Sequence, residues 1–125
     1  MFNFTGERPS NLGVKDGQLT ACPGTPNCVN SQSDDPQSKI EPLPAASIAE
    51  LKDVVEGMER TTIVEETDNY LYAEFQSKLM GYVDDVEFYL DPGANVTHVR
   101  SASRLGKSDL GVNRKRVEEI RSKLK

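Results

Sequence analysis

Hydrophobic and polar positions divide the chain into an irregular arm and two helical segments that flank a strand-rich stretch. Residues 1–44 are rich in Gly, Pro, Asn and Ser and show neither a helical nor a strand period, which is typical of an extended arm. A helix is predicted within residues 47–60, where Ser47 and Glu50 form an S-x-x-E capping box. The apolar stripe of this helix comprises Ile48, Leu51, Val54, Val55 and Met58. A second helix is predicted over residues 113–124, beginning at an Asn N-cap.

Four runs between the helices have the composition and alternation of strands. They cover residues 61–65, 70–76, 85–91 and 96–102. The order α-β-β-β-β-α with short connections predicts an α+β fold, in which an antiparallel sheet of about four strands carries two helices on one face. With 125 residues the chain is one domain. We divide it into the irregular N-terminal arm, 1–44, and an α+β core, 45–125.

Alternation along the strands assigns side chains to the two faces of this sheet. The side chains expected to meet the helices are Leu71, Ala73, Phe75, Val86, Phe88 and Leu90. The opposite face is expected to carry Tyr70, Tyr72, Glu74, Gln76, Glu87 and Tyr89, with His98 and Arg100 beside them. A face that is both aromatic and charged is covered either by the N-terminal arm or by a partner.

The charge of the chain is unevenly distributed. Its net charge is −5, which argues against a general nucleic-acid binder. Residues 98–125 carry nine Lys and Arg against three Asp and Glu, whereas the preceding residues carry six against seventeen. The basic end therefore either docks on the acidic body or presents a basic face to an acidic partner or an anionic ligand. No apolar run approaches the roughly 20 residues of a membrane helix, and the N-terminus lacks the form of a secretory signal.

The two cysteines lie in the loop Cys22-Pro-Gly-Thr-Pro-Asn-Cys28. This spacing fits a disulfide, and it fits equally a pair of reduced thiols that anchor the loop or act as a redox switch. A structural zinc site needs four ligands, whereas the chain offers two cysteines and one histidine. The sequence predicts no metal and no cofactor.

Carboxylates concentrate on the predicted strands at Glu74, Asp84, Asp85 and Glu87. They could form a catalytic pair. Arg100 and Arg104 favour instead a charged ladder across the sheet, because Arg100 shares a face with Glu87. His98, the one histidine of the chain, is more simply a packed polar residue than a base. A Ser-His-Asp triad with Ser101 or Ser103 can be composed, but no nucleophile elbow would present the serine.

The segment from Ser101 to Ser108 ends in Gly106-Lys107-Ser108, like a phosphate-binding P-loop without its first glycine. The predicted antiparallel sheet argues against nucleotide hydrolysis. The serines, with Arg100, Arg104, Lys107 and Arg114, could still cradle a phosphate, sulfate or carboxylate. The last helix begins with three basic residues, whose positive charge is unfavourable at the N-terminal end of the helix dipole. This charge is balanced either by Asp84, Asp85 and Asp109 or by a bound anion or acidic partner.

Three motifs carry a family resemblance: ACPGTPNCVNSQ, YAEFQSKLMGYVDDVEF and HVRSASRLGKSDLGVNRKRVE. Together they resemble the DUF1499 family, a domain of unknown function, over about residues 8–121. The opening FNFTGERPSNLGVKDGQLTACP looks closest to its cyanobacterial and plastid members. The resemblance implies that residues 98–104 and 109–116 belong to the family core, and it carries no catalytic residues over to this chain.

These observations favour a binding module for an acidic protein partner or a small anion, and an accessory place in a photosynthetic-membrane assembly is one candidate setting for it. The alternatives are a small enzyme with a Glu/His/Arg pocket and a purely structural subunit. We expect a cytoplasmic or plastid-stroma-like location, with peripheral thylakoid association open. The residues predicted to bind a ligand or partner are Glu74, Glu87, His98, Arg100, Ser101, Ser103, Arg104, Asp109, Asn113 and Arg114.

Overall fold

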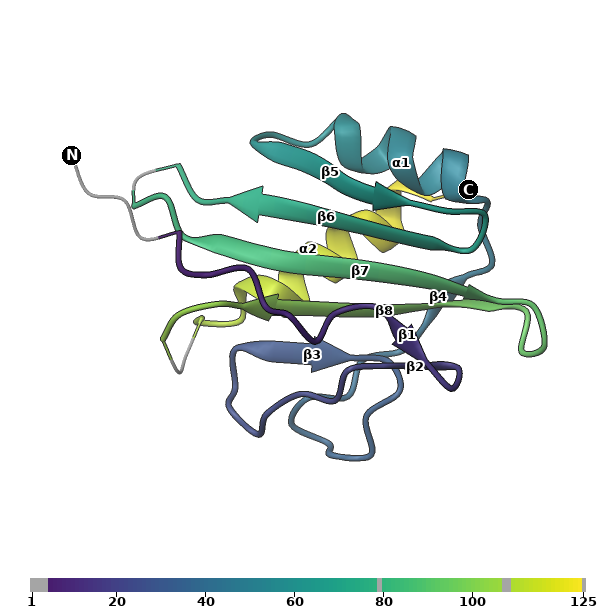
Figure 1. Ribbon diagram of the computed structural model, residues 1–125, viewed down its shortest axis with the longest axis horizontal. Coiled ribbons are helices and arrows are strands. Elements are labelled where there is room, and N and C mark those ends of the chain that lie inside the picture. The colour runs from purple at the N-terminus through teal and green to yellow at the C-terminus, as the bar shows by residue number, and fades with distance from the viewer. Residues whose placement is uncertain (1–4, 79, 107–108, 125) are drawn as a thin grey trace.

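One antiparallel sheet organises the protein, and both helices lie on the same face of it (Figure 1). The structure is a computed structural model that describes residues 5–78, 80–106 and 109–124. In chain order, the elements are β1 (Val14–Lys15), β2 (Gln18–Leu19), β3 (Cys28–Asn30), β4 (Leu43–Pro44), α1 (Ile48–Glu56), β5 (Thr61–Glu66), β6 (Tyr70–Gln76), β7 (Val83–Asp91), β8 (Val96–Ser103) and α2 (Val112–Lys123). The α+β class predicted from the sequence is thus observed.

The main sheet has six strands, so the expectation of about four was too low. Its order is β3-β8-β7-β6-β5, and β4 also pairs with β8, while β1 and β2 form a separate two-stranded sheet. The four long strands occupy the predicted runs. The two additional strands, β3 and β4, come from the arm, where segments of three and two residues are too short to show an alternation of their own. Residues 5–44 are therefore less irregular than predicted.

The predicted capping box forms at the start of α1. The Ser47 hydroxyl accepts a hydrogen bond from the Glu50 backbone N–H at 3.1 Å. The helix ends at Glu56, and the N–H of Gly57 closes its last turn. Leu51 and Val55 on its inner face are fully buried. Helix α1 is therefore shorter than the predicted segment, but it faces the sheet with the predicted stripe.

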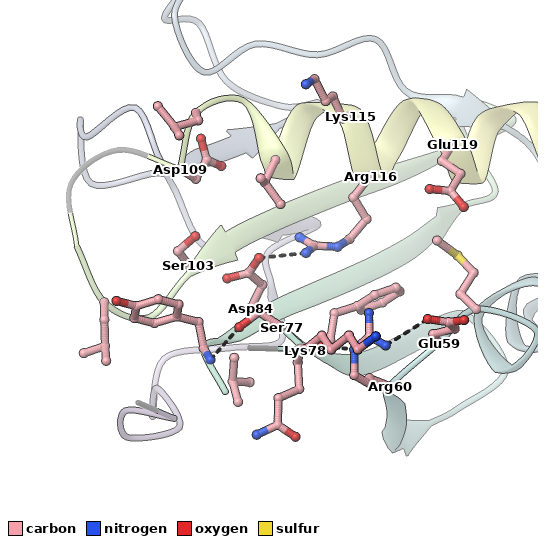
Figure 2. A pocket seen from close by; sticks show the side chains of 18 of the residues that line it. Glu59, Arg60, Ser77, Lys78, Asp84, Ser103, Asp109, Lys115, Arg116 and Glu119 are labelled. Carbon is pink, nitrogen blue, oxygen red and sulfur yellow. Dashed lines mark hydrogen bonds and ion pairs between the residues drawn. The ribbon is translucent and has the colours of Figure 1, made fainter. Parts of the chain in front are cut away.

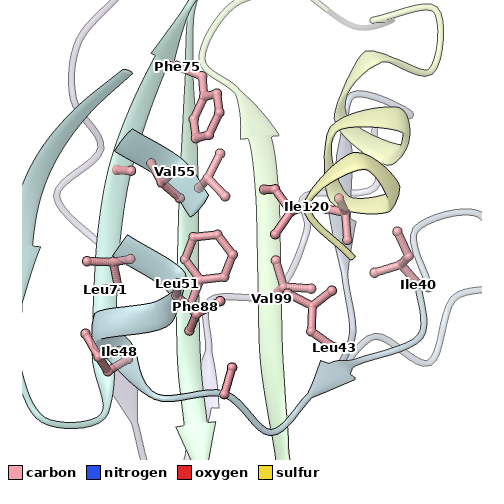
Figure 3. Packing of buried hydrophobic residues seen from close by; sticks show 14 of the residues in the cluster. Ile40, Leu43, Ile48, Leu51, Val55, Leu71, Phe75, Phe88, Val99 and Ile120 are labelled. Carbon is pink, nitrogen blue, oxygen red and sulfur yellow. The ribbon is translucent and has the colours of Figure 1, made fainter. Parts of the chain in front are cut away.

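The hydrophobic core fills the space between the sheet and the two helices (Figure 3). Its central side chain is Phe88 of β7, which is fully buried. The sheet contributes the predicted inward residues except Leu90, and Ile40 and Leu43 of the arm close one side. Val117 and Ile120 hold α2 against the same core. Burial of this apolar surface fixes which face of each strand points away from the helices.

The arm covers the other face of the sheet. Of the two predicted alternatives for that face, cover by the arm or by a partner, the structure shows the first. In Figure 1 its first part, in purple, runs across β7 and β8 on the side opposite the helices. Leu19 packs there with Tyr70 and Tyr72. Gly13 brings its backbone close enough to donate its N–H to Glu87 Oε1 at 2.7 Å, with a φ of 108° that favours glycine. The polar face is therefore largely an interior surface.

Cys22 and Cys28 form a disulfide, with their Cα atoms 5.7 Å apart. Of the two arrangements that the spacing allowed, the structure contains the oxidised one. Cys28 is buried and pairs with Ala102 of β8. The side chain of Asn27, just before it, donates a hydrogen bond to the Gly106 carbonyl at 2.7 Å. The disulfide loop therefore connects the arm to the segment that precedes α2.

We expect the double variant Cys22→Ser/Cys28→Ser to unfold with a free energy about 2 kcal/mol lower than wild type, because the short covalent loop no longer restricts the unfolded chain. Urea denaturation under non-reducing conditions measures this difference. Adding a dithiol reductant should lower wild-type stability to that of the variant and leave the variant unchanged. Equal stability of the two proteins without reductant would contradict the prediction.

Candidate functional site

The predicted polar ladder exists and runs across four strands. Tyr72, Glu87, Arg100 and Asn30 are neighbours in one row of the sheet. Glu87 is fully buried, and its Oε1 accepts hydrogen bonds from the Tyr70 hydroxyl at 2.6 Å and from the arm. Burial raises the pKa of Glu87. The same burial, opposed by the attraction of Glu87, lowers the pKa of Arg100.

Arg104 is the central cation of the adjoining row. Its Nε and Nη2 donate to both oxygens of Asp85 at 2.8 Å, a bidentate pair. Nη2 also donates to Glu74 Oε2 at 2.5 Å. These acceptors raise the pKa of Arg104, with Asp85 as the largest cause. The Tyr72 hydroxyl donates a short hydrogen bond to Asp85, so one arginine, two carboxylates and a tyrosine form a closed cluster.

Arg8 of the arm completes this cluster from above. Its Nη2 lies 2.8 Å from Glu74 Oε2, and its guanidinium lies 6.0 Å from the centre of the Tyr72 ring. Burial alone would raise the pKa of Glu74, but the hydrogen bonds from Arg8 and Arg104 lower it overall. Glu74 is therefore an ionised partner of two arginines. This arrangement is the structural ion pairing that the sequence favoured over a catalytic carboxylate.

The structure divides the ten predicted binding residues between opposite faces of the sheet. Because side chains alternate along β8, His98, Arg100 and Arg104 face the arm, whereas Ser101 and Ser103 face α2. The predicted anion cradle cannot be assembled from both sets at once. Lys107 and Ser108, which complete the P-loop-like sequence, lie outside the described residues.

His98 is held by neighbours on the arm side. Its Nδ1 lies 2.9 Å from Ser31 Oγ, which itself accepts the Val99 backbone N–H. The serine hydroxyl and Nδ1 thus share a hydrogen bond whose direction follows the tautomer of the imidazole, and Nε2 faces Asp91 Oδ2 at 3.8 Å. Burial lowers the pKa of His98. Ser31 is buried, so this grouping orders the sheet edge and does not present a serine nucleophile.

Asn113 joins β8 to α2 and does not cap the helix, so the predicted N-cap was wrong. Helix α2 begins at Val112, after Gly111 in a left-handed conformation. Asn113 lies inside the first turn and is fully buried. Its side chain accepts from the Ser101 hydroxyl at 2.6 Å and donates to Ser103 Oγ at 2.9 Å. These family-motif residues thus fix the helix onto the strand.

Asp109 takes over the capping role. Its carboxylate accepts the backbone N–H groups of Gly111 at 2.8 Å and Asn113 at 2.9 Å. Burial opposes ionisation, but these hydrogen bonds lower the pKa of Asp109 overall. The negative charge of this carboxylate also offsets the positive charge of the basic residues in the first turn of α2. Arg114, by contrast, donates to the backbone carbonyls of Lys39 and Gln37 and so holds the arm.

A groove lies on the helix side of the sheet, and the sequence did not point to it (Figure 2). It has a volume of about 1130 Å³. One wall is the connection between α1 and β5, residues 57–60, and the other is α2 along its length, while the floor is formed by the adjacent ends of β6, β7 and β8. Arg116 crosses it, 2.8 Å from Asp84 Oδ2 and 4.9 Å from the centre of the Phe75 ring.

Most exposed apolar side chains gather around this groove. Four of the five exposed large hydrophobic residues among those described line it: Tyr82, Leu105, Leu110 and Val112, with exposures of 44%, 42%, 88% and 45%. In the sequence these residues stand in connections, without helical or strand period. The one sequence feature that could have indicated an exposed apolar surface is that these residues stand next to glycines, in Gly81-Tyr82, Leu105-Gly106 and Leu110-Gly111-Val112.

No group of three or more His, Cys, Asp or Glu side chains among the described residues could hold a metal ion. No helix in the described part of the chain is long and apolar enough to cross a membrane. The candidate sites are therefore the groove and the covered polar face.

Arg104→Met should lower the free energy of unfolding by about 3–5 kcal/mol, because it leaves the buried Asp85 carboxylate without its cation. The double variant Arg104→Met/Asp85→Asn should recover part of this loss. Chemical denaturation of both variants and of Asp85→Asn alone, analysed as a double-mutant cycle, measures the coupling. Additive effects would show that the pair is not coupled.

Asp109→Ala should cost about 1–2 kcal/mol at neutral pH through loss of the cap. The pKa of Asp109 is lower in the folded protein than in the unfolded chain, where it is about 4. The stabilisation that comes from its charge is therefore fully present at pH values above about 4, and it is lost as the pH falls through the folded pKa. Urea denaturation at a series of acidic pH values should therefore show the free energies of unfolding of wild type and Asp109→Ala converging as the pH falls. Asp34→Ala, at an exposed aspartate, is the control and should show no such convergence. A pH-independent difference for Asp109→Ala would contradict the role of the charge.

The family model described as a protein of unknown function (DUF1499) matches residues 18–124 of the chain. Comparison with curated proteins and with solved structures gives no significant match. The matched range includes the disulfide loop, all long strands and α2, and it contains the three motifs that carried the resemblance in the sequence. The chain therefore belongs to the DUF1499 family.

Proposed function

We propose that this protein is a binding module that docks an acidic, partly apolar segment of a partner protein in the groove between α1 and α2. The single observation that carries the proposal is the concentration of exposed hydrophobic side chains there, four of five among the described residues. Such a concentration on an otherwise charged chain marks an interaction surface. The open shape and the volume of about 1130 Å³ suit a polypeptide segment.

The charges of the groove favour an acidic occupant. Each acidic residue that lines it already has a partner: Glu59 pairs with Arg60, Asp84 with Arg116 and Glu119 with Lys123, and Asp109 caps α2. Lys78 and Lys115 also line the groove, and neither forms an ion pair with a described residue. The residues that line the groove therefore carry a net positive charge, although the chain as a whole has a net charge of −5.

The alternative of a small enzyme has weaker support. Its proposed residues, Glu74, Glu87, His98 and Arg100, lie beneath the arm, and Glu87 is fully buried. General acid-base catalysis requires a group within reach of substrate. The pairing of Glu74 with Arg104 and of Glu87 with Arg100 instead supports a stabilising role. A purely structural subunit would leave the apolar lining of the groove without a purpose.

A place in a photosynthetic-membrane assembly remains part of the proposal, on the ground of the resemblance to cyanobacterial and plastid members. The same holds for a cytoplasmic or stroma-like location and for peripheral thylakoid association. The disulfide bears on this question, because such bonds persist mainly in oxidising compartments. Within the proposal, the disulfide therefore favours the stroma-like location over a strongly reducing cytoplasm.

The docking proposal is tested with an array of extended peptides that combine Asp and Glu with apolar residues, followed by fluorescence polarisation on those that bind. Val112→Gln and Lys78→Glu should each weaken binding by about fivefold or more, equivalent to about 1 kcal/mol. Added salt should weaken binding by wild type.

Two control variants make the same changes in residue type at positions outside the groove. Val14→Gln alters the exposed hydrophobic residue that does not line it, and Lys15→Glu reverses a charge on the β1-β2 hairpin. Both should bind like wild type. If no acidic peptide binds, or if all four variants bind equally, the groove is not the docking site.

A further inference from the structure

Four non-glycine residues in the described part of the chain have a positive φ, a conformation that strains most side chains. Asp16 and Asn95 lie in the turns between β1 and β2 and between β7 and β8, and these two residue types tolerate the left-handed region. The other two, Arg60 and Leu110, have φ values of 56° and 55°, and both line the groove. The less tolerated outliers therefore coincide with the candidate docking site, and functional sites are where such strain gathers.

Contacts within the fold account for the conformation of Arg60. Its backbone carbonyl accepts the Gln76 N–H at 3.0 Å, and its Nε donates to the Gln76 carbonyl at 3.1 Å. Its guanidinium also pairs with Glu59 at 2.8 Å. These contacts hold the start of β5 on β6 and offset the strain at Arg60.

The cap of α2 sets the backbone at Leu110. The Asp109 carboxylate accepts the Gly111 N–H at 2.8 Å, and the Asp109 carbonyl accepts the Val112 N–H at 3.1 Å. Gly111 is also left-handed, with a φ of 81°. The turn before the helix thus explains the positive φ at position 110. Glycine or asparagine would adopt this φ at lower cost than leucine.

Burial does not offset the strain at Leu110. Its side chain is 88% exposed, the highest value among the exposed large hydrophobic residues of the described structure. Little of the stabilisation that a buried leucine gives is therefore gained in the isolated protein. Leu105 and Val112, which are 42% and 45% exposed, line the same groove. Leu110 is thus a large apolar side chain that the free protein holds at a cost and that a docked segment can bury.

We propose that Leu110 is the anchor that determines which segments the groove accepts, by packing against a bulky apolar side chain of the docked segment. This inference rests on the proposed function and adds to it the contact that selects the partner. Asp109, beside Leu110, stands at one end of the groove, and Glu59 and Glu119 stand at the other (Figure 2). The segment therefore carries its apolar residue at the end where α2 begins.

An acidic peptide that binds wild type in fluorescence polarisation tests the anchor. Leu110→Asn should weaken its binding about tenfold, because asparagine removes the apolar contact. The same substitution should raise the Tm by about 3 °C, because asparagine tolerates the left-handed φ. Leu110→Met keeps an apolar side chain of similar volume, so it should bind close to wild type with an unchanged Tm.

Val14→Asn is the matched control, because it makes a similar loss of apolar character outside the groove. Val14 is 37% exposed, does not line the groove and has no positive φ. This variant should bind the peptide like wild type, and its Tm should not rise. Weaker affinity together with higher stability is therefore expected of Leu110→Asn alone.

Peptides with alanine at each apolar position in turn locate the contact on the partner. One of them should bind wild type about tenfold more weakly and lose little further affinity for Leu110→Asn, since both changes remove the same contact. If Leu110→Asn binds like wild type, if the losses are additive at every position, or if its Tm falls, the anchor is overturned and the docking proposal stands. Failure of every peptide to bind wild type would instead overturn the docking proposal, and the anchor with it.

Discussion

The pairing of three acidic side chains on β7 with three arginines from the C-terminal part of the chain is the constraint on which the rest of the structure depends. Asp84, Asp85 and Glu87 are buried in the central strand. They meet Arg116 of α2, Arg104 after β8 and Arg100 within β8, respectively. Because a buried carboxylate without a cation is costly, these pairs fix both the register of β8 on β7 and the position of α2.

The same pairing explains the uneven charge along the sequence. Most of the basic end is used internally: besides the three paired arginines, Arg114 and Arg121 donate to backbone carbonyls of the arm. The acidic body and basic end are therefore two halves of one fold, as the simpler interpretation of the charge pattern held. What remains available for a partner is a small surplus of lysines beside exposed apolar side chains.

The sheet separates two surfaces with different physical character. On the arm side, charges and tyrosines are enclosed beneath the arm. On the helix side, the network of Asn113 with Ser101 and Ser103 places α2 so that an open groove remains beside α1. The Asn27 side chain reaches the Gly106 carbonyl from the disulfide loop, so that loop borders the first surface and supports the second.

The sequence by itself determined the α+β class, the four long strands, the two helices and the side of the sheet on which each side chain lies, because periods of 2 and 3.6 residues are local properties. It also predicted the ladder of Glu87 with Arg100. Only the tertiary structure decided that β3 and β4 join the sheet, that Asp109 and not Asn113 caps α2, and that Leu105 and Val112 line the same groove. These features depend on contacts between residues far apart in the chain, which leave no periodic signal in either segment.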